Sequence, residues 1–402
     1  MKHLAVVGGG FAGMWAALTA AREFAKAAAE CRITLVSRDE YLTVRPRLYE
    51  VFTPEMRAAL APVLAPAGIE LLVGNVDGID LPHRRLQVHT GDGVARGVHF
   101  DRVVLAAGSV QRPLPVPGSN GCAFDIDTFE GARRLDEHLR DVLRDARDDT
   151  DLTCVIVGGG FTGIELAAEM RTRLRAHRAD ALVERARVVL VERASEIGPD
   201  LGSNPRPHVL AALTAAGVEL RLGCTVRAIG PDAIELSDGT RIPTRTVIVT
   251  AGLAATPLAG TLGAPCDATG RVHVDDMLRV KGVETVFAAG DAAHALAAPG
   301  HPALMSCQHA VPMGKHAGFN AAHDLLGLPL RAYSQPNYVT CLDLGEYGAL
   351  FTSGWERTPE QSGPEVKPLK RMINTQWIYP PTGDRAAILE AADLDAPWPP
   401  KT

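Results

Sequence analysis

Short apolar runs alternate along the chain with longer stretches in which small and polar residues mix. Residues 4–7 (LAVV) and 154–157 (CVIV) each precede a glycine-rich turn, which leads into a segment rich in alanine. A second apolar run follows each segment, at residues 33–36 and 188–191. Apolar runs of this length with many β-branched side chains are typical of buried strands, and strands that alternate with helices favour parallel sheets. The pattern therefore predicts an α/β fold built from βαβ units.

The stretch 4–21 carries no charged residue, so its hydropathy is close to that of a membrane span or a signal peptide. Gly8, Gly9, Gly10 and Gly13 interrupt it. Each glycine costs a continuous helix about 1 kcal/mol relative to alanine. We therefore predict a short strand, a tight turn and a buried helix in place of a membrane helix.

The chain repeats this plan once at long range, because Gly158 opens a second glycine-rich turn 150 residues after Gly8. Two further apolar runs, 103–105 and 247–249, end in small-residue turns, and the closely spaced prolines of 113–117 predict a stiff crossover. We predict two Rossmann-like (βαβ) dinucleotide-binding domains, with the second inserted into the first. The predicted boundaries are 1–112 and 251–330 for the first domain, 113–250 for the inserted domain and 331–402 for a small C-terminal unit.

The composition narrows the class of protein. Of the 402 residues, 46% are hydrophobic and 22% are charged, as in ordinary soluble globular proteins. A net charge of −6 and only 5% aromatic residues make a nucleic-acid partner unexpected. The seven cysteines are scattered, without a C-x-x-C pair, so we expect reduced thiols in a cytoplasmic protein and no metal site.

Both glycine-rich turns have the form G-x-G-x-x-G, between a predicted strand and a predicted helix. The first glycine permits a tight turn, the second lets a pyrophosphate approach the backbone, and the third lets the helix pack closely on the strand. The helix N-terminus adds free N–H groups and a partial positive charge. The sequence therefore predicts two nucleotide sites, formed by Gly8, Gly10 and Gly13 and by Gly158, Gly160 and Gly163.

The residue after the second strand of each unit indicates which nucleotide binds. In the inserted domain it is Glu192, whose carboxylate would accept hydrogen bonds from ribose hydroxyls and repel a 2′-phosphate. This favours NADH over NADPH, although the adjacent Arg193 could accommodate the phosphate. In the first domain the same position is Ser37, followed by Arg38; a serine can bond a ribose hydroxyl but adds no charge.

A third motif, residues 285–293, runs from an apolar strand into Gly290 and Asp291. With the two glycine-rich turns in this order, the chain resembles flavoproteins that have two dinucleotide-binding domains. In those proteins the Gly-Asp pair closes over FAD, and the aspartate bonds the ribityl hydroxyls. The resemblance therefore implies that Asp291 is an FAD ligand.

Within the pyridine nucleotide-disulfide oxidoreductase superfamily, the chain is most similar to the type II NADH dehydrogenases. The similarity lies in RPRLYEV at 45–51, GFTGIELAAEM at 160–170, the turn 250–252 and the segment 287–320. It implies that the first domain binds FAD, the inserted domain binds NADH, and electrons pass from NADH through FAD to a quinone. The implied cofactor contacts are Gly8, Gly10, Phe11, Ala12, Gly13, Ser37, Arg38, Arg45, Val76, Ala107, Gly108, Gly290 and Asp291 for FAD, and Gly158, Gly160, Phe161, Thr162, Gly163, Glu192 and Gly252 for NADH.

The resemblance also implies two catalytic residues. Glu165, expected in the first turn of the helix after Gly163, matches a glutamate that lies near the nicotinamide and the flavin. Gln308 matches the first of two glutamines beside the quinone, but Pro312 stands where the second would be and cannot replace an amide side chain. No cysteine lies between residues 32 and 121, where disulfide reductases carry their cysteine pair. Electrons would therefore pass directly from flavin to an external acceptor.

Pro312 leaves the acceptor open. The alternatives are a soluble NAD(P)H-dependent reductase of another metabolite or redox partner, a non-enzymatic NADH-binding sensor, and a sulfide:quinone oxidoreductase-like enzyme. The last would need cysteines beside the flavin, for which the candidates are Cys122, Cys307 and Cys341.

The sequence leaves association with other molecules open. NAD(P)H and a small acceptor are the expected partners, and a homodimer is not excluded. The cytoplasmic face of a membrane is the alternative location. There, Lys367, Lys370 and Arg371 would contact anionic lipid, unless they lie on a solvated edge.

Overall fold

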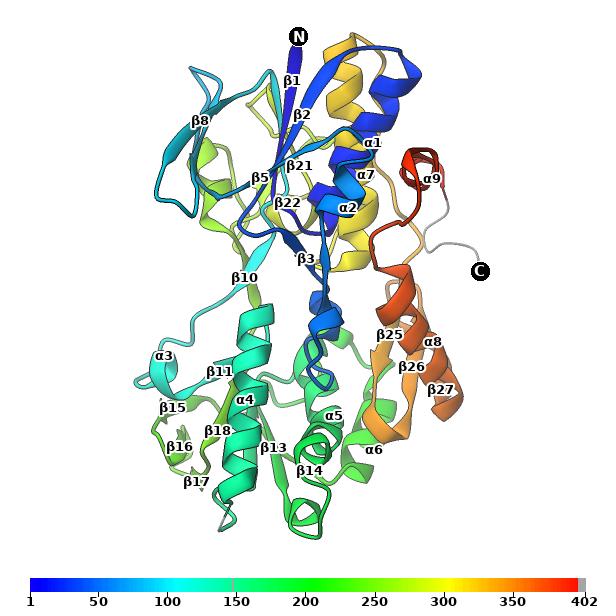
Figure 1. Ribbon diagram of the computed structural model, residues 1–402. Helices are drawn as coiled ribbons and strands as arrows, with labels where there is room; N and C mark the ends of the chain where they lie inside the picture. Colours follow the sequence, from blue (N-terminus) through cyan, green and yellow to red (C-terminus); the bar gives the residue numbers. More distant parts are fainter. Residues whose placement is uncertain (147, 397–402) are drawn as a thin grey trace.

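A five-stranded parallel sheet forms the centre of the first lobe of the computed structural model, which describes residues 1–146 and 148–396 (Figure 1). Four of its five strands are almost entirely buried, which explains their continuous apolar runs, whereas the edge strand at residues 70–73 is partly exposed. In spatial order they are β21 (Val286–Ala288), β9 (Arg102–Leu105), β1 (Lys2–Val7), β2 (Cys31–Ser37) and β5 (Glu70–Val73).

Helices α1 (Phe11–Lys26) and α7 (Cys307–Leu326) lie side by side in this lobe (Figure 1). Gly314 and Gly318 of α7 face α1, and a Cβ atom at either position would collide with the backbone of α1. The two helices therefore pack in backbone contact. Smaller elements complete the lobe: β3 (Tyr41–Thr43), β4 (Arg57–Ala59), α2 (Ala61–Leu64), β6 (Asn75–Asp80), β7 (Arg85–His89), β8 (Ala95–His99), β20 (Val272–His273), β22 (Ala293–His294), β23 (Leu296–Ala298) and β24 (His301–Pro302).

The second lobe repeats the plan with another five-stranded parallel sheet. In spatial order its strands are β11 (Phe124–Asp125), β18 (Thr246–Val249), β12 (Thr153–Val157), β13 (Arg187–Glu192) and β14 (Val218–Leu222). The other elements are α3 (Ser119–Cys122), α4 (Phe129–Asp145), α5 (Phe161–His177), α6 (Arg206–Ala215) and an antiparallel sheet of β15 (Val226–Ile229), β16 (Ala233–Leu236) and β17 (Arg241–Pro243).

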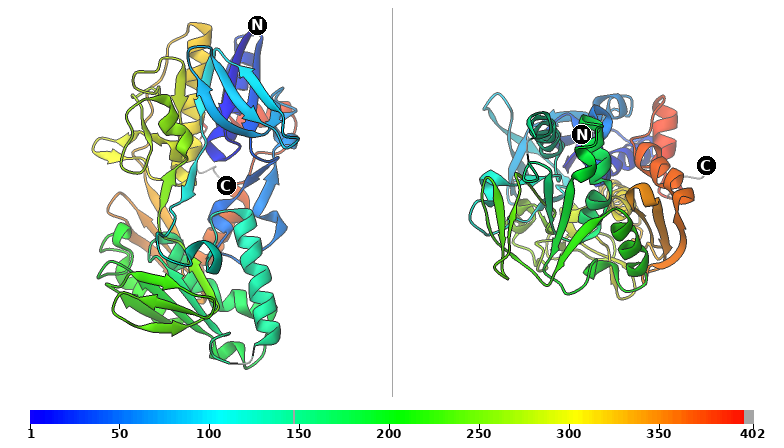
Figure 2. Two further views of the ribbon diagram at one scale, coloured as in Figure 1. Left: turned by 90° about the vertical axis from the view of Figure 1, so that its left-hand side faces the viewer. Right: turned by 90° about the horizontal axis from the view of Figure 1, so that it is seen from below.

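The chain passes from the first lobe to the second and back through two paired strands (Figure 2). These are β10 (Ser109–Gln111) and β19 (Leu253–Ala255), which form an antiparallel pair. The predicted α/β class, with one Rossmann-like unit inserted into the other, is confirmed. One segment crosses over without being predicted to do so: Leu48, Tyr49 and Met56 belong by sequence to the first lobe but pack in the core of the second.

The C-terminal unit lies along one side of both lobes (Figures 1 and 2). It consists of an antiparallel sheet, a helix that ends in a π-helical turn at Ile373–Trp377, and a last helix that packs on α1. None of the described helices is long and apolar enough to cross a membrane. The elements are β25 (Val339–Asp343), β26 (Ala349–Ser353), β27 (Thr358–Gly363), α8 (Lys367–Met372) and α9 (Arg385–Ala391).

Candidate functional site

The carboxyl ends of the parallel strands gather most of the predicted cofactor residues. In an open α/β sheet this edge is where ligands bind. In the first lobe, β1 leads into Gly8, β2 ends at Ser37, β9 leads into Ala107 and Gly108, and β21 leads into Gly290. The sheet thus brings together residues that lie up to 282 positions apart in the sequence.

The turn Gly8–Gly13 and the first turn of α1 form what we call the first cradle. Gly8 has φ +112°, a conformation that favours glycine, and a Cβ atom at Gly13 would collide with the Gly8 carbonyl oxygen. Gly10 precedes α1 without a side-chain cap, and a Cβ atom there would meet nothing within 4 Å. The helix therefore presents uncapped N–H groups to open space, as an anion site requires.

Asp291 lies beside the first cradle. The adjacent Gly290 faces α1, since a Cβ atom there would lie 2.9 Å from the Cβ atom of Ala12. Ser109 Oγ donates to Asp291 Oδ2 at 2.6 Å, and Arg45 Nη1 lies 3.6 Å from the same oxygen. Burial raises the pKa of Asp291, and the charge of Arg45 opposes that shift. An uncapped helix end with a half-buried carboxylate beside it fits a pyrophosphate joined to a chain of hydroxyl groups.

The remaining residues predicted at the first cradle differ in exposure. Phe11 is buried in the first turn of α1, Ser37 is buried at the end of β2, and Val76 is half-buried near the start of β6. Arg38 is exposed. Their contact with a nucleotide stays a prediction.

The turn Gly158–Gly163 and the first turn of α5 form the second cradle. Gly158 has φ +116°, and Gly160 is again an uncapped helix start with open space beside it. Thr250 Oγ1 donates to the Gly158 carbonyl at 3.0 Å. Phe161 is half-buried and Thr162 is exposed at the start of α5, and Gly252 follows β18 two residues after Thr250.

Glu192 lies at the end of β13 and holds the second cradle. Its Oε2 accepts from the Gly159 N–H at 2.7 Å, and its Oε1 accepts from the Ala194 N–H at 2.8 Å. A carboxylate oxygen can accept more than one hydrogen bond, so both oxygens retain acceptor capacity. The side chain is only 7% exposed, whereas the neighbouring Arg193 is exposed.

Polar contacts join the first lobe to the second at the carboxyl ends of the two sheets. Arg45, from the first lobe, forms an ion pair with Asp127, which follows β11 of the second lobe. Gln111 donates from its N–H to Asp127 at 3.0 Å and from Nε2 to the Val249 carbonyl at 2.7 Å. The carboxyl ends of both sheets therefore meet at one place.

Glu165 lies in a buried group of charges beside the second cradle. The prediction that it lies in the first turn of α5 was wrong, because the helix begins at Phe161 and Glu165 is its fifth residue. Its Oε1 lies 2.8 Å from Lys370 Nζ and accepts from the Asp343 N–H at 3.0 Å. Burial raises the pKa of Glu165 to about 7, and Lys370 opposes the shift. Burial alone would lower the pKa of Lys370, but the charge of Glu165 contributes to raising it to about 12.

Lys367 extends this group of charges. It forms ion pairs with Glu169 on α5 and with Asp343 on β25. Tyr49 donates its hydroxyl to Asp343 Oδ2 at 2.9 Å. We call Tyr49, Glu165, Glu169, Asp343, Lys367 and Lys370 the junction cluster, because it joins the second lobe, the 45–51 segment and the C-terminal unit.

The junction cluster corrects the prediction that Lys367, Lys370 and Arg371 would contact anionic lipid. Lys367 and Lys370 point inward to carboxylates, and Arg371 alone of the three is exposed. The three-residue spacing of the two lysines indicates one helix face. Which face is buried depends on carboxylates that lie far away in the sequence, so no local pattern indicates it.

Gln308 lies in the first turn of α7, and its carbonyl has lost its helical donor because Pro312 has no N–H. Gln335 Nε2 donates to that carbonyl at 3.0 Å. The Gln308 amide faces Val339, and the amide orientation that satisfies both groups has its nitrogen donate to the Val339 carbonyl at 2.6 Å and its oxygen accept from the Val339 N–H at 3.2 Å. Gln308 thus ties α7 to β25, and its contact with an acceptor stays a prediction.

The structure does not assemble the three candidate cysteines into one site. Cys122 packs beside the antiparallel sheet of the second lobe, whereas Cys307 packs with the core of the first. Burial raises the pKa of Cys307 and of Cys341 to about 11, so both thiols stay protonated near neutral pH. Protonated thiols are poor nucleophiles, which disfavours the sulfide-oxidising alternative.

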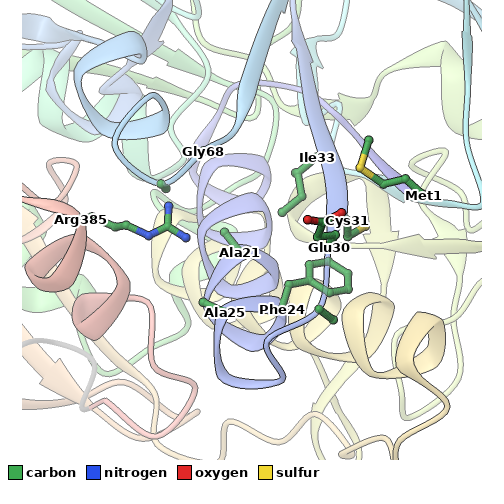
Figure 3. A pocket seen from close by; sticks show the side chains of 11 residues that line it. Met1, Ala21, Phe24, Ala25, Glu30, Cys31, Ile33, Gly68 and Arg385 are labelled. Carbon is green, nitrogen blue, oxygen red and sulfur yellow. The ribbon is translucent and has the colours of Figure 1, made fainter.

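A groove of about 380 Å³ lies at the opposite edge of the first sheet (Figure 3). It is lined by Phe24 at the far end of α1, by Cys31 and Ile33 at the start of β2, and by Arg385. The groove therefore lies at the amino end of β2. The groove is therefore separate from the two cradles.

Comparison with known proteins shows which family and which relatives the chain is similar to. The sequence pattern of the pyridine nucleotide-disulphide oxidoreductases matches residues 2–314. An NADH dehydrogenase-like protein of Mycobacterium tuberculosis is 42% identical over 396 residues, 98% of each chain. A demethylphylloquinone reductase of Synechocystis is 28% identical over 408 residues, covering 95% of this chain and 97% of the relative. The solved structure of NDH2 from Plasmodium falciparum in complex with NADH superposes with a TM-score of 0.79, covering 94% of this chain and 95% of that chain at 12% identity, which shows a common fold.

Proposed function

The chain belongs to the pyridine nucleotide-disulphide oxidoreductase family, and from that membership we propose an FAD-dependent NADH dehydrogenase that passes electrons to a quinone-type acceptor. The observation that carries the proposal is the pair of uncapped cradles whose lobes are joined by the Arg45–Asp127 ion pair. One cradle alone would be enough to bind a nucleotide. Two joined cradles can hold two nucleotides close enough for electrons to pass between them.

FAD is assigned to the first cradle. The N–H groups of the first turn of α1 would hold its pyrophosphate, and Asp291 would bond its ribityl hydroxyls. Arg45 keeps positive charge beside Asp291, which favours the ionised, acceptor-only carboxylate. Bound there, flavin would supply the two-electron chemistry that protein side chains lack.

NADH is assigned to the second cradle. Glu192 is held in place by the N–H groups of Gly159 and Ala194, so its carboxylate is preorganised for ribose hydroxyls. The buried negative charge disfavours a 2′-phosphate at the same place. The names of the relatives, which include an NADH dehydrogenase-like protein and a demethylphylloquinone reductase, support both ends of the proposed reaction.

The Glu165–Lys370 pair is assigned to proton supply on the acceptor side. Reduction of a quinone to a quinol takes up two protons. Lys370 is 5% exposed. Its charge opposes the rise that burial causes in the pKa of Cys307 and of Cys341, so Lys370 lies close to the start of α7 and to β25. Near neutral pH Lys370 is protonated, so it can donate a proton to the acceptor, and Glu165, with a pKa of about 7, can then return a proton to the lysine.

The test is steady-state turnover of the purified flavoprotein with NADH and one acceptor at a time: a benzoquinone, a naphthoquinone, a redox dye and oxygen. The proposal expects a quinone to give the highest kcat/KM. A protein that oxidises NADH only with dyes or oxygen would contradict the quinone assignment while leaving the NADH assignment intact. Lys370→Met should lower quinone turnover more than the rate at which NADH reduces the flavin, with Arg371→Met as the exposed control.

A further inference from the structure

Arg173 on α5 is a buried charge with few partners. It is 1% exposed, and its Nη1 donates to the carbonyls of Leu48 at 3.2 Å and Tyr49 at 3.4 Å. Among the described residues, Nε and Nη2 have no hydrogen-bond partner. Burial lowers the pKa of Arg173 to about 10. Burial of an ion costs several kcal/mol, so we expect a buried charge at this position to have a structural or functional role.

The charges of Asp136 and Glu169 raise the pKa of Arg173, but neither carboxylate accepts a hydrogen bond from it, and each is paired with other residues. Asp136 accepts from His177 at 2.9 Å and from Arg140 at 2.8 Å. Glu169 forms its ion pair with Lys367. The hydrogen bonds that Arg173 itself makes are to the backbone of a segment from the other lobe.

That segment connects the two cradles. Residues 45–51 begin with Arg45, which reaches Ser109, Asp291 and Asp127, and they include Tyr49, which bonds Asp343 of the junction cluster. Arg173 lies 13 residues after Gly160 on the same helix, or about 20 Å along it. A single rigid helix therefore begins at the second cradle and holds, at Arg173, the segment that reaches the first.

We propose that Arg173 is a positioning residue that fixes residues 45–51 on α5 and thereby fixes the second cradle relative to Arg45 and Asp291. The inference rests on the proposed function, since it concerns the alignment of two nucleotide sites. Arg173 lies in neither cradle. A planar guanidinium can donate to two successive carbonyls from a fixed position, which a lysine ammonium does less well and a methionine cannot do.

The first test is hydrogen–deuterium exchange of the purified flavoprotein, which requires no turnover. The amide of Arg47 bonds the Val44 carbonyl, and those of Leu48 and Glu50 bond carbonyls within residues 45–51, so all three report the order of the segment. Arg173→Met should speed their exchange by about tenfold or more, with Arg173→Lys between it and the wild type. The matched control is Arg171→Met, because Arg171 bonds the carbonyls of Ala216 and Glu184 within the second lobe. Unchanged exchange of residues 45–51 in Arg173→Met, or equal change in both methionine variants, would overturn the proposal.

The second test is anaerobic reduction of the bound flavin by NADH in a stopped-flow instrument. Arg173→Met should lower the limiting rate by about ten- to a hundredfold, since small displacements of reacting groups cost that much. The half-saturating NADH concentration should stay within about twofold of the wild type, because Arg173 is remote from the second cradle. Arg171→Met should react like the wild type, and a wild-type rate in Arg173→Met would contradict the proposal.

The two tests separate this inference from the proposed function. If NADH fails to reduce the wild-type flavin, the proposed function is wrong, and the exchange experiment still decides whether Arg173 orders residues 45–51. If Arg173→Met does not fold, Arg173→Lys undergoes the same two measurements with the same control.

Discussion

The two cradles have almost the same backbone, and a serine at the adjacent strand end of one corresponds to a glutamate in the other. Gly10 and Gly160 share φ −79° and ψ −170°, and Gly8 and Gly158 differ by only 4° in φ. At the strand end that follows, the first cradle has Ser37 and the second has Glu192. The backbone geometry suits any pyrophosphate, so the strand-end side chain is where the two sites can select different nucleotides.

The outer faces of the two cradle helices are covered in different ways. Helix α1 packs against Gly314 and Gly318 of α7 in backbone contact. Helix α5 is covered by the 45–51 segment and the C-terminal unit, through the junction cluster and Arg173. The position of α1 therefore depends on the close packing of small residues, whereas the position of α5 depends on buried charges.

The largest expected effect comes from adding one methyl group to either cradle. A Cβ atom at Gly13 or at Gly163 would collide with the carbonyl oxygen of Gly8 or Gly158. We expect Gly13→Ala to purify without flavin, and Gly163→Ala to keep a flavin that NADH no longer reduces. Visible absorbance and NADH titration measure the two losses. Gly260→Ala is the control, since a Cβ atom there meets nothing within 4 Å. Loss of flavin in Gly163→Ala and its retention in Gly13→Ala would reverse the assignment of the cradles.

Removal of the positive partner in the junction cluster should have the next largest effect. Lys370→Met leaves Glu165 buried without its cation, which typically costs about 3–5 kcal/mol of unfolding free energy. Denaturant unfolding measures the loss. Adding Glu165→Gln to Lys370→Met should restore part of it, because no buried charge then stays unpaired. A change within about 0.5 kcal/mol, as expected for Arg371→Met, would mean that the pair is not buried in solution.

The sequence predicted the two cradles well because each is a local pattern. A strand, three glycines and a helix lie within 25 residues, and the shape of the turn follows from the glycines themselves. The junction cluster could not be predicted in this way, since Glu165 and Lys370 lie 205 residues apart and meet only after the C-terminal unit docks on α5. The same holds for Gln335, which replaces the hydrogen bond that Pro312 removes from Gln308. Long-range pairing, not local propensity, decides those positions.

The pH dependence of the unfolding free energy tests the protonation state of Glu165 in the folded protein. Its pKa is raised from 4.5 to about 7 in the folded protein, so the folded state binds more protons than the unfolded state between these values. Stability from this group is therefore present below about pH 4.5 and is lost as the pH rises to 7. Relative to Glu165→Gln, which does not titrate, the wild type should lose about 2–3 kcal/mol over this range. A constant difference between the two proteins would show that the pKa of Glu165 is not raised.

The smallest of these effects should come from making the second cradle resemble the first. Glu192→Ser removes the acceptor of the Gly159 and Ala194 N–H groups. It also removes the carboxylate proposed to accept from the ribose hydroxyls, and a hydrogen bond to a charged group contributes about 1.5–3 kcal/mol, so half-saturating NADH should rise about tenfold or more. NADPH should lose less, because a repelling charge is removed. Flavin content serves as the internal control and should stay unchanged. An unaltered NADH-to-NADPH ratio of kcat/KM would contradict the role of Glu192.

The account as a whole depends on electrons crossing from a nucleotide in the second cradle to a flavin in the first. The most direct measurement is an anaerobic titration of the purified protein with NADH, followed by its visible absorbance. We predict a yellow protein that loses its flavin absorbance in proportion to the NADH added. A colourless protein that takes up no flavin, or a bound flavin that dithionite reduces and NADH does not, would contradict the account.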